Sequence, residues 1–366
     1  RHSTADYQQS SSLSLLFGSF IGQQYFFIHM KTIPLLLLSF LSLCACSSQK
    51  DKIEIYQTKR SNEINVRDRI KEIDMGDVLI SRYSGPYILD QYLIIGDYWS
   101  KDTVVFIFDK NNFRHICSTA LVGPGPDEIT GFGSVGINEK EREFYLSDHG
   151  KHKIYKYSLD SVLADPQNYK HKVKVDLKER IPTRYVYVND TLSYGIFMLP
   201  YHDHSFDVSI AKWDMTNNTV IPLNYVNPEI KRVRASFAVS LEQEVIVECF
   251  SHNDLMTILD LDGNLKYNVY GPDWNNEMTN RRDFFKDVVI AGDKIIASTA
   301  FGGAHTSKET LTTAFLVFDL QGNYLHTLET GSDILGFCYD KDNNRLIICF
   351  DAEIQYGYLD LSQLEI

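Results

Sequence analysis

Short apolar runs alternate with polar turns along most of the chain. From about Tyr87 onward one unit recurs six times: a short apolar strand, a polar turn, a second strand, a looser loop and a third strand that ends near an aspartate. The aspartates at the ends of the third strands are separated by 51, 54, 46, 59 and 41 residues. A period of about 50 residues suits a unit of four strands. The third strands are predicted at 104–109, 154–160, 208–214, 255–260, 314–319 and 354–360.

The polar turns contain the residues that favour tight β-hairpins. Gly263 and Gly322 each stand between a polar residue and an asparagine, where glycine takes the positive φ of a tight turn. Fourth strands follow these two turns at 265–270 and 324–328. No stretch longer than about 12 residues has the apolar spacing of an amphipathic helix, so helices are expected to be minor. The second strands are predicted at 92–96, 143–147, 192–198, 245–250, 294–299 and 345–350.

Six antiparallel units in series must bury their faces against one another. Radial stacking achieves this, and it predicts an all-β, six-bladed β-propeller of four-stranded blades over residues 69–366. Only six residues follow Asp360, so the last blade ends at its third strand. We therefore expect an N-terminal strand, within 70–80, to close that blade. A pair of β-sandwiches is the alternative, but it needs no common 50-residue period.

The first 45 residues are predicted to be a targeting segment. Lys31 supplies a positive charge, 33–43 is an apolar run of 11 residues, and the sequence Leu-Cys-Ala-Cys ends at Cys46. This pattern resembles the lipobox of bacterial lipoproteins, which implies cleavage before Cys46 and acylation of that residue. A plain secretory signal or a buried apolar helix are the alternatives. The predicted organisation is an upstream extension from a mis-assigned start at 1–29, a lipoprotein signal peptide at 30–45, and the lipidated cysteine with its tether at 46–68.

The residues after Cys46 bear on which membrane holds the protein. No aspartate directly follows the cysteine, so retention at the inner membrane is not indicated. The segment 49–51, Gln-Lys-Asp, resembles the charged tag that sends some lipoproteins to the cell surface. We expect an outer-membrane lipoprotein, on the periplasmic face or the cell surface, with the membrane as a partner through its lipid anchor.

Charge and cysteine content exclude two classes of function. The chain has 48 acidic against 36 basic residues and a formal net charge of −12, so a nucleic-acid partner is not expected. No CxxC or Cys/His ligand pattern is present, which argues against a structural zinc site. Cys338 and Cys349 fall on consecutive predicted strands. Whether they pair as a disulfide depends on a register that the sequence does not give.

Two motifs carry a family resemblance. Residues 148–157, Asp-His-Gly-Lys-His-Lys-Ile-Tyr-Lys-Tyr, resemble the signature of NHL-like and TolB-like six-bladed propellers. Residues 123–128, Gly-Pro-Gly-Pro-Asp-Glu, resemble the blade junction of TolB-like propeller lipoproteins of unknown function. The resemblance implies a propeller on a lipid anchor. The aspartate of the first motif recurs clearly only at Asp97 and Asp148.

Loops on one face of such a propeller hold the candidate ligand residues. Aromatic rings there would stack on a sugar or peptide, or else pack between blades. His202 and His204 are candidates for a metal, because alternate residues of an extended strand point the same way. The simpler reading is that loops collect polar residues and that Asp97 and Asp148 hold turns. The predicted ligand face comprises Tyr98, Trp99, His149, Tyr201, His202, His204, His252, Phe301 and His305.

The expected function is therefore binding. No nucleophile elbow, phosphate loop or HExxH helix is present, so we assign no catalytic residue and expect no cofactor. The leading hypothesis is a membrane-anchored extracytoplasmic lipoprotein that binds a ligand or envelope protein through the loop face of its propeller. The alternative is a propeller hydrolase or lyase that uses a His-rich channel mouth with a divalent cation.

Overall fold

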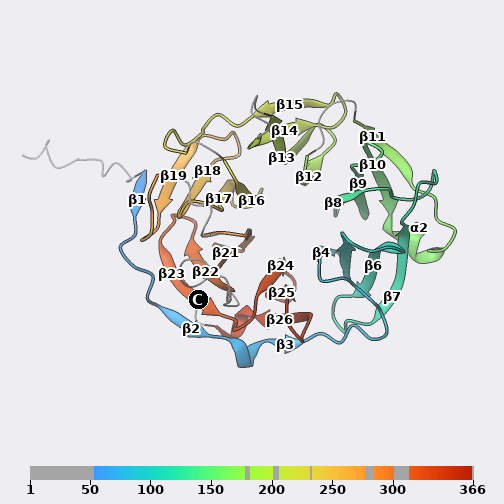
Figure 1. Ribbon diagram of the computed structural model, residues 1–366, viewed down its shortest axis with the longest axis horizontal. Helices are drawn as coiled ribbons and strands as arrows, with labels where there is room; N and C mark the ends of the chain where they lie inside the picture. Colours follow the sequence, from blue (N-terminus) through green and yellow to red (C-terminus); the bar gives the residue numbers. More distant parts are fainter. Residues whose placement is uncertain are drawn as a thin grey trace, which may run out of the picture. The chain divides into compact units, whose positions relative to one another are not determined.

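Six antiparallel sheets follow one another around a ring in the computed structural model (Figure 1). The structure describes residues 53–177, 182–200, 206–230, 233–276, 284–300 and 313–364, all within the compact unit formed by residues 52–366. The predicted signal peptide and Cys46 lie outside the described residues. The prediction of a six-bladed propeller with four antiparallel strands per blade is confirmed.

Each of the first five blades holds four consecutive strands, ordered from the centre of the ring outward (Figure 1). Blades 1 and 2 comprise β4 (Ser84–Leu89), β5 (Tyr92–Asp97), β6 (Thr103–Asp109), β7 (His115–Leu121), β8 (Phe132–Asn138), β9 (Glu143–Asp148), β10 (Lys153–Ser158) and β11 (Lys172–Asp176). Blades 3 and 4 comprise β12 (Arg184–Asn189), β13 (Leu192–Pro200), β14 (Phe206–Asp214), β15 (Thr219–Pro222), β16 (Ala235–Ser240), β17 (Val245–Phe250), β18 (Leu255–Leu259) and β19 (Leu265–Tyr270). Blade 5 comprises β20 (Asp287–Ala291), β21 (Lys294–Ala300), β22 (Thr313–Asp319) and β23 (Tyr324–Glu329).

The sixth blade is closed from the other end of the chain. It contains β24 (Ile334–Asp340), β25 (Arg345–Phe350) and β26 (Tyr356–Asp360), and its fourth strand is β3 (Lys71–Glu72). β3 runs antiparallel to β26, with Lys71 opposite Tyr358 and Glu72 opposite Gly357. The expected closure by an N-terminal strand is confirmed, although the strand occupies only two residues of the predicted range.

The N-terminal segment also runs along the outside of blades 4 and 5. β1 (Glu54–Tyr56) adds a fifth strand parallel to β19, and β2 (Glu63–Asn65) adds one parallel to β23 (Figure 1). Between them Arg60 forms a 2.9 Å ion pair with the buried carboxylate of Asp254, and its guanidinium lies over two phenylalanine rings. Part of the stretch predicted as a tether is therefore paired with the blades from Glu54 onward.

Continuous apolar strands are explained by burial on both faces. In β5, Leu93 and Ile95 pack against blade 6, while Ile94 between them packs against blade 2. Because successive strand residues point to opposite faces, every position of such a strand is apolar. Hydrophobic clusters fill the interfaces between neighbouring blades, and the cluster between blades 6 and 1 joins Ile347 and Cys349 to Leu93 and Ile95. This last cluster completes the ring.

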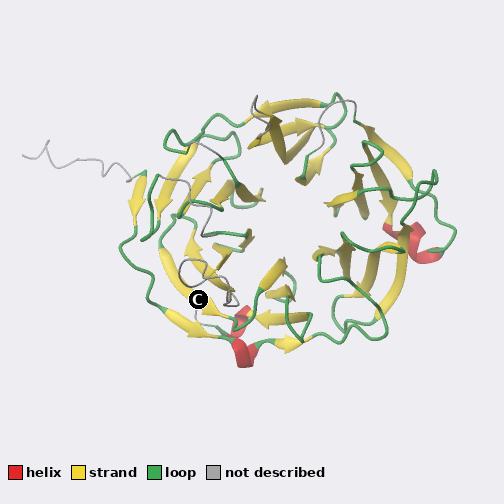
Figure 2. Cartoon of the chain, viewed as in Figure 1, coloured by secondary structure: helices red, strands yellow, loops and turns green. Residues whose placement is uncertain are grey.

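Helical structure is sparse, as predicted (Figure 2). The helical elements among the described residues are α2 (Leu159–Ala164) and the 3₁₀ turns η1 (Arg67–Arg69) and η2 (Leu361–Gln363). No helix in this part of the chain has the length and apolar content needed to span a membrane. Gly263 and Gly322 both have a φ of 82°, as their hairpin turns require.

All four cysteines of the described residues are free thiols. Across the hairpin, Cys338 lies opposite Ile347, and Cys349 lies opposite Gly336. This register places neither cysteine directly opposite the other.

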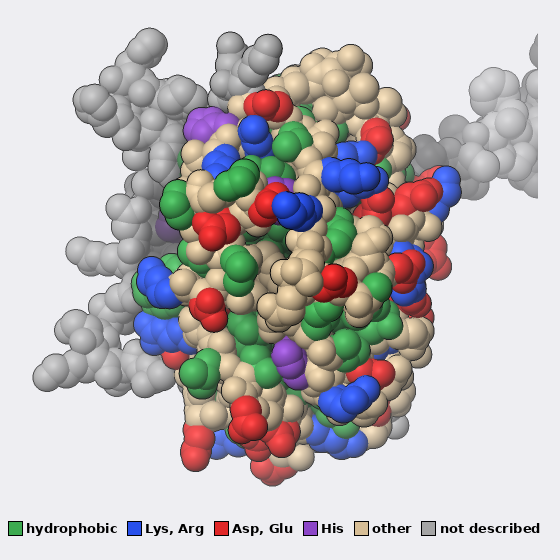
Figure 3. All heavy atoms as spheres, turned by 90° about the vertical axis from the view of Figure 1, so that its right-hand side faces the viewer, with side chains coloured by type: hydrophobic (Ala, Val, Ile, Leu, Met, Phe, Trp, Pro, Cys, Tyr) green, Lys and Arg blue, Asp and Glu red, His purple; other side chains and the backbone are tan. Residues whose placement is uncertain are grey.

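The outer surface over blades 1 and 2 carries acidic and basic side chains interspersed with hydrophobic ones (Figure 3).

Candidate ligand-binding face

The strand directions place two kinds of loop on the same side of the ring. Within a blade, the second strand runs toward the loop that leads to the third strand. The fourth strand runs the same way, toward the connection to the next blade. We call this side the loop face, and the opposite side, which carries the remaining turns, the turn face. The described members of the predicted ligand set, Tyr98, Trp99, His149 and His252, belong to the loop face.

Two buried aspartates hold the loop face in blades 1 and 2. Asp97, at the end of β5, accepts hydrogen bonds from the backbone and hydroxyl of Ser81 and from the backbone of Trp99. Asp148, at the end of β9, accepts four backbone N–H bonds. The donors are Thr130, Gly131, Gly150 and Lys151, at 2.9 to 3.1 Å. Both carboxylates therefore serve the turn-holding role that the simpler reading gave them.

Tyr98 is 37% exposed and contacts the innermost strands of blades 1 and 2. Its hydroxyl lies 2.7 Å from that of Tyr87, and its ring stacks on Phe132 of blade 2 with centroids 4.9 Å apart. Burial raises the pKa of both phenols, so they stay protonated at neutral pH. Tyr98 therefore joins blades 1 and 2 and leaves its neighbour Trp99 as the outward-facing ring.

Trp99 lies exposed beside a second aromatic ring and a cation. Its side chain is 61% exposed, and its ring centroid is 3.8 Å from that of Tyr83. Arg82 lies over the Tyr83 ring at 4.8 Å, donates to the Tyr83 hydroxyl at 2.7 Å, and pairs with Asp351 of blade 6 at 3.2 Å. We call Arg82, Tyr83 and Trp99 the Trp99 platform. It combines two aromatic rings, tilted by 36° to each other, with a neighbouring guanidinium.

The two described histidines of the predicted face lie apart. His149 follows β9 in blade 2 and His252 follows β17 in blade 4, so blade 3 lies between them. The imidazole of His149 lies on Gly133, where an added Cβ would come within 2.2 Å of Nε2. Burial lowers the pKa of His149, which keeps the ring neutral at pH 7. The other predicted residues, Tyr201, His202, His204, Phe301 and His305, lie outside the described residues.

An ion pair across the centre of the ring was not predicted from the sequence. Arg184 is the first residue of β12 in blade 3, and its guanidinium pairs with Asp287, the first residue of β20 in blade 5. Desolvation opposes the charge of Arg184, but Asp287 outweighs this and raises the arginine pKa. Two charged residues 103 positions apart carry no local pattern, so only the ring geometry reveals the contact.

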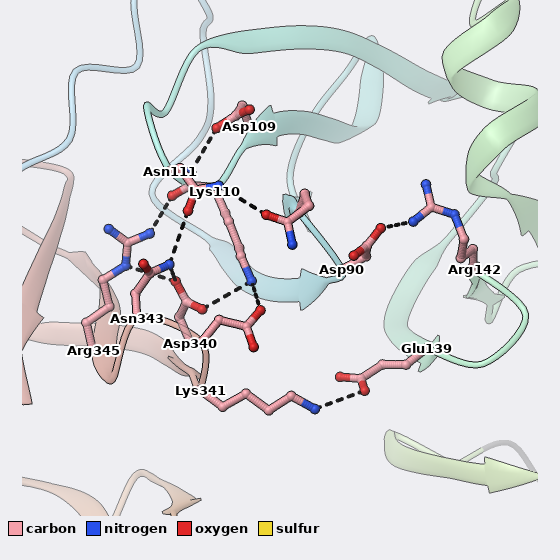
Figure 4. Close-up of polar contacts among 12 residues, drawn as sticks. Asp90, Asp109, Lys110, Asn111, Glu139, Arg142, Asp340, Lys341, Asn343 and Arg345 are labelled. Carbon is pink, nitrogen blue, oxygen red and sulfur yellow. Dashed lines mark hydrogen bonds and ion pairs between the residues drawn. The ribbon is translucent and has the colours of Figure 1, made fainter.

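The turn face is held by charges that pair with each other (Figure 4). Lys341 of blade 6 pairs with Glu139 of blade 2 at 3.2 Å, and Arg142 pairs with Asp90 of blade 1. These pairs border a hollow of about 570 Å³ between blades 1, 2 and 6. Because each of these charged side chains already has a partner, we interpret the ion pairs as contacts that hold the blades together. The hollow is lined by Tyr87, Ile88, Asp90, Ile137, Glu139, Lys140, Arg142, Cys338, Tyr339, Lys341 and Asp342.

Within the part of the chain that the structure describes, no group of three or more His, Cys, Asp or Glu side chains converges as a metal site would require. His202, His204 and His305 fall outside that part. The metal prediction at His202 and His204 therefore stays a prediction.

Comparisons with known proteins agree on the fold. A family model described as a 6-bladed beta-propeller, DUF5128, matches residues 75–207. No curated protein matches the chain in sequence. A member of the duf4221 family from Bacteroides vulgatus superposes with a TM-score of 0.57 and 9% identity, over 79% of this chain and 94% of that one.

Two further structures are similar. A candidate exported protein from Bacteroides fragilis gives a TM-score of 0.51 with 8% identity, over 82% of this chain and 88% of that one. A gluconolactonase from Xanthomonas campestris gives 0.49 with 12% identity, over 81% and 97%. For the two structures with TM-scores of 0.57 and 0.51, identities of 9% and 8% limit the likeness to the fold. The narrower resemblance to TolB-like and NHL-like propellers stays a prediction. The chain is a six-bladed β-propeller, and residues 75–207 carry the sequence pattern of the DUF5128 propellers.

Proposed function

We propose that this chain is a lipid-anchored protein of the bacterial cell envelope whose propeller binds a ligand or partner protein through the loop face. The Trp99 platform is the observation that carries the binding half of this proposal. A tryptophan that is 61% exposed leaves a large apolar surface in water, unless a ligand covers it. An exposed indole ring beside Tyr83, which itself carries the Arg82 cation, suits stacking on a sugar ring or an aromatic or proline-containing peptide.

The anchoring half rests on the sequence around Cys46. At about 3.5 Å per residue, the chain from Cys46 to the start of β1 at Glu54 reaches at most about 28 Å. A lipid on Cys46 would therefore hold blade 4, along which β1 lies, close to the membrane surface. Two or more acyl chains give stable anchoring, because one chain alone binds only marginally.

The anchor predicts a specific effect of one cysteine. Expressed from Met30 in a Gram-negative host, the wild-type protein is expected to incorporate a labelled fatty acid and to enter the detergent phase on Triton X-114 partition. Cys46→Ala is expected to abolish the fatty-acid label, because it removes the acylated residue. Cys44→Ala, two residues upstream in the predicted signal peptide, is the matched control and should keep the label. Label retained by Cys46→Ala would refute the anchor.

The binding face predicts a specific effect of one aromatic residue. We would screen the chain expressed from Ser47, without the signal peptide and Cys46, on glycan and peptide arrays. Trp99→Ala is expected to weaken every hit at least tenfold while changing the free energy of unfolding by less than about 0.5 kcal/mol, since the residue is exposed.

Tyr56→Ala is the matched control for the array experiment. Tyr56 is 64% exposed, close to the value for Trp99, but it stacks on Tyr270 at the outer edge of blade 4. This variant should keep all hits. Hits that survive Trp99→Ala, or that are lost equally in Tyr56→Ala, would rule out the Trp99 platform as the binding surface.

A further inference from the structure

A small pocket lies between blades 3 and 4 on the side of the loop face. It has a volume of about 140 Å³ and is bounded by the start of β14, the end of β17 and the connection between blades 3 and 4. Its walls are mostly apolar and include two aromatic rings, those of Tyr225 and Phe250. The lining comprises Val208, Ser209, Ile210, Leu223, Tyr225, Val226, Asn227, Val233, Glu248 and Phe250.

A carboxyl group without a partner points into this pocket. Along β17, Ile246, Glu248 and Phe250 alternate with residues that pack against blade 5, so Glu248 faces blade 3. The side chain of Glu248 makes no hydrogen bond or ion pair among the described residues, and it is partly exposed at the pocket. Burial raises the pKa of this carboxyl to about 7. A carboxylate that is largely withdrawn from water is stabilised by a partner of opposite charge.

The other polar groups of the lining already have partners. The Tyr225 hydroxyl accepts a hydrogen bond from the side chain of Asn268 at 2.7 Å. The side-chain oxygen of Asn227 accepts from the backbone of Glu229 at 2.9 Å. The Glu248 carboxyl is therefore the acidic group of the pocket that has no protein partner among the described residues, and a cationic donor would complement it.

We propose that this pocket binds a protonated primary amine on a short apolar stem, with the ammonium group against Glu248 and the stem between Tyr225 and Phe250. Aromatic faces attract a desolvated cation, and the aliphatic walls cover the stem. An engineered cavity of about 150 Å³ in another protein holds benzene, so this pocket fits about five or six non-hydrogen atoms. A lysine side chain and n-butylammonium have this size.

The pocket is a different site from the Trp99 platform. That platform lies where blades 1 and 6 meet, and in a ring of six blades the interface between blades 3 and 4 lies opposite. Binding at one site can fail without failure at the other. A free alkylamine and the lysine side chain of a peptide share the required chemistry, and the test includes a probe for each.

The test uses the full chain titrated with n-butylammonium, with N-acetyl-lysine methylamide and with neutral 1-butanol, followed by ligand-observed NMR. We expect n-butylammonium to bind at least tenfold more tightly than 1-butanol. Binding of the lysine derivative as well would identify a peptide side chain as the source, and its failure would restrict the site to free amines. Equal binding of n-butylammonium and 1-butanol would overturn the proposal.

Variants assign the binding to this pocket. Glu248→Gln is expected to weaken n-butylammonium binding at least tenfold. Glu242→Gln is the matched control, because it removes the same charge from an exposed turn of the same blade and should leave binding unchanged. Val226→Trp should also block binding, since Val226 is 65% exposed at the pocket and tolerates a larger residue. Unchanged binding in both folded pocket variants would refute the assignment.

Discussion

The Lys110→Met variant is expected to lose about 3 kcal/mol of unfolding free energy, because it leaves a buried carboxylate short of a cation. Lys110 belongs to blade 1 and is 1% exposed, and its Nζ lies 3.4 Å from the buried Asp340 of blade 6. It also contacts the more exposed Asp342. Arg345 remains on Asp340 at 2.9 Å, so the loss should fall at the lower end of the range for broken buried pairs (Figure 4). Urea denaturation would measure it.

Lys341→Met is the matched control for this experiment. Lys341 is adjacent to Asp340, but it is 67% exposed and pairs with the exposed Glu139 at 3.2 Å. Exposed pairs of this kind contribute less than about 1 kcal/mol. If the two variants lost equal unfolding free energy, the buried contact between blades 1 and 6 would stabilise the ring no more than an exposed ion pair does.

Replacing Glu248 with glutamine is expected to stabilise the protein above neutral pH and to leave it unchanged in acid. Burial raises the pKa of Glu248 to about 7 in the folded state, against 4.5 for the free group. Between these values the unfolded chain has released a proton that the folded chain keeps, so the wild type loses stability as pH rises from 4.5 to 7. The difference in pKa corresponds to about 3 kcal/mol.

The measurement is urea denaturation of both proteins from pH 4 to pH 8. The curves should coincide near pH 4 and separate progressively, with Glu248→Gln about 3 kcal/mol more stable at pH 8. Subtracting the two curves removes the contributions of other groups that titrate in both proteins. A constant difference across this range would mean that Glu248 keeps an ordinary pKa.

The repeating part of the fold was accessible from the sequence because its strands are buried on both faces. Such strands read as unbroken apolar runs, and the second strand predicted at 345–350 is β25 to the residue. The polar residues of the predicted turns also identified Gly263 and Gly322 as positions of positive φ. The N-terminal strands β1 and β2 escaped prediction, because each has only three residues and exposes the first and third. Their pairing depends on strand edges more than 200 residues away.

The candidate site was predictable only as a face. Alternation of strand direction placed Tyr98, Trp99, His149 and His252 on loops of one side, but it did not distinguish which rings pack against the blades. Tyr98 and Trp99 are adjacent in the sequence. The hydrogen bond between the hydroxyls of Tyr98 and Tyr87 holds Tyr98 against the blades, and Trp99 remains exposed. Glu248 lay within a predicted strand, and nothing local marked it as facing a cavity. Both features depend on packing between blades, which sequence periodicity does not describe.

Hydrogen–deuterium exchange on a complex with the tightest array ligand tests most directly whether the loop face is the binding surface. The ligand is predicted to protect residues 82–83 and 98–102, around the Trp99 platform. Protection confined to 90–91, 139–142 and 341–344, the turns of the opposite face, would contradict it.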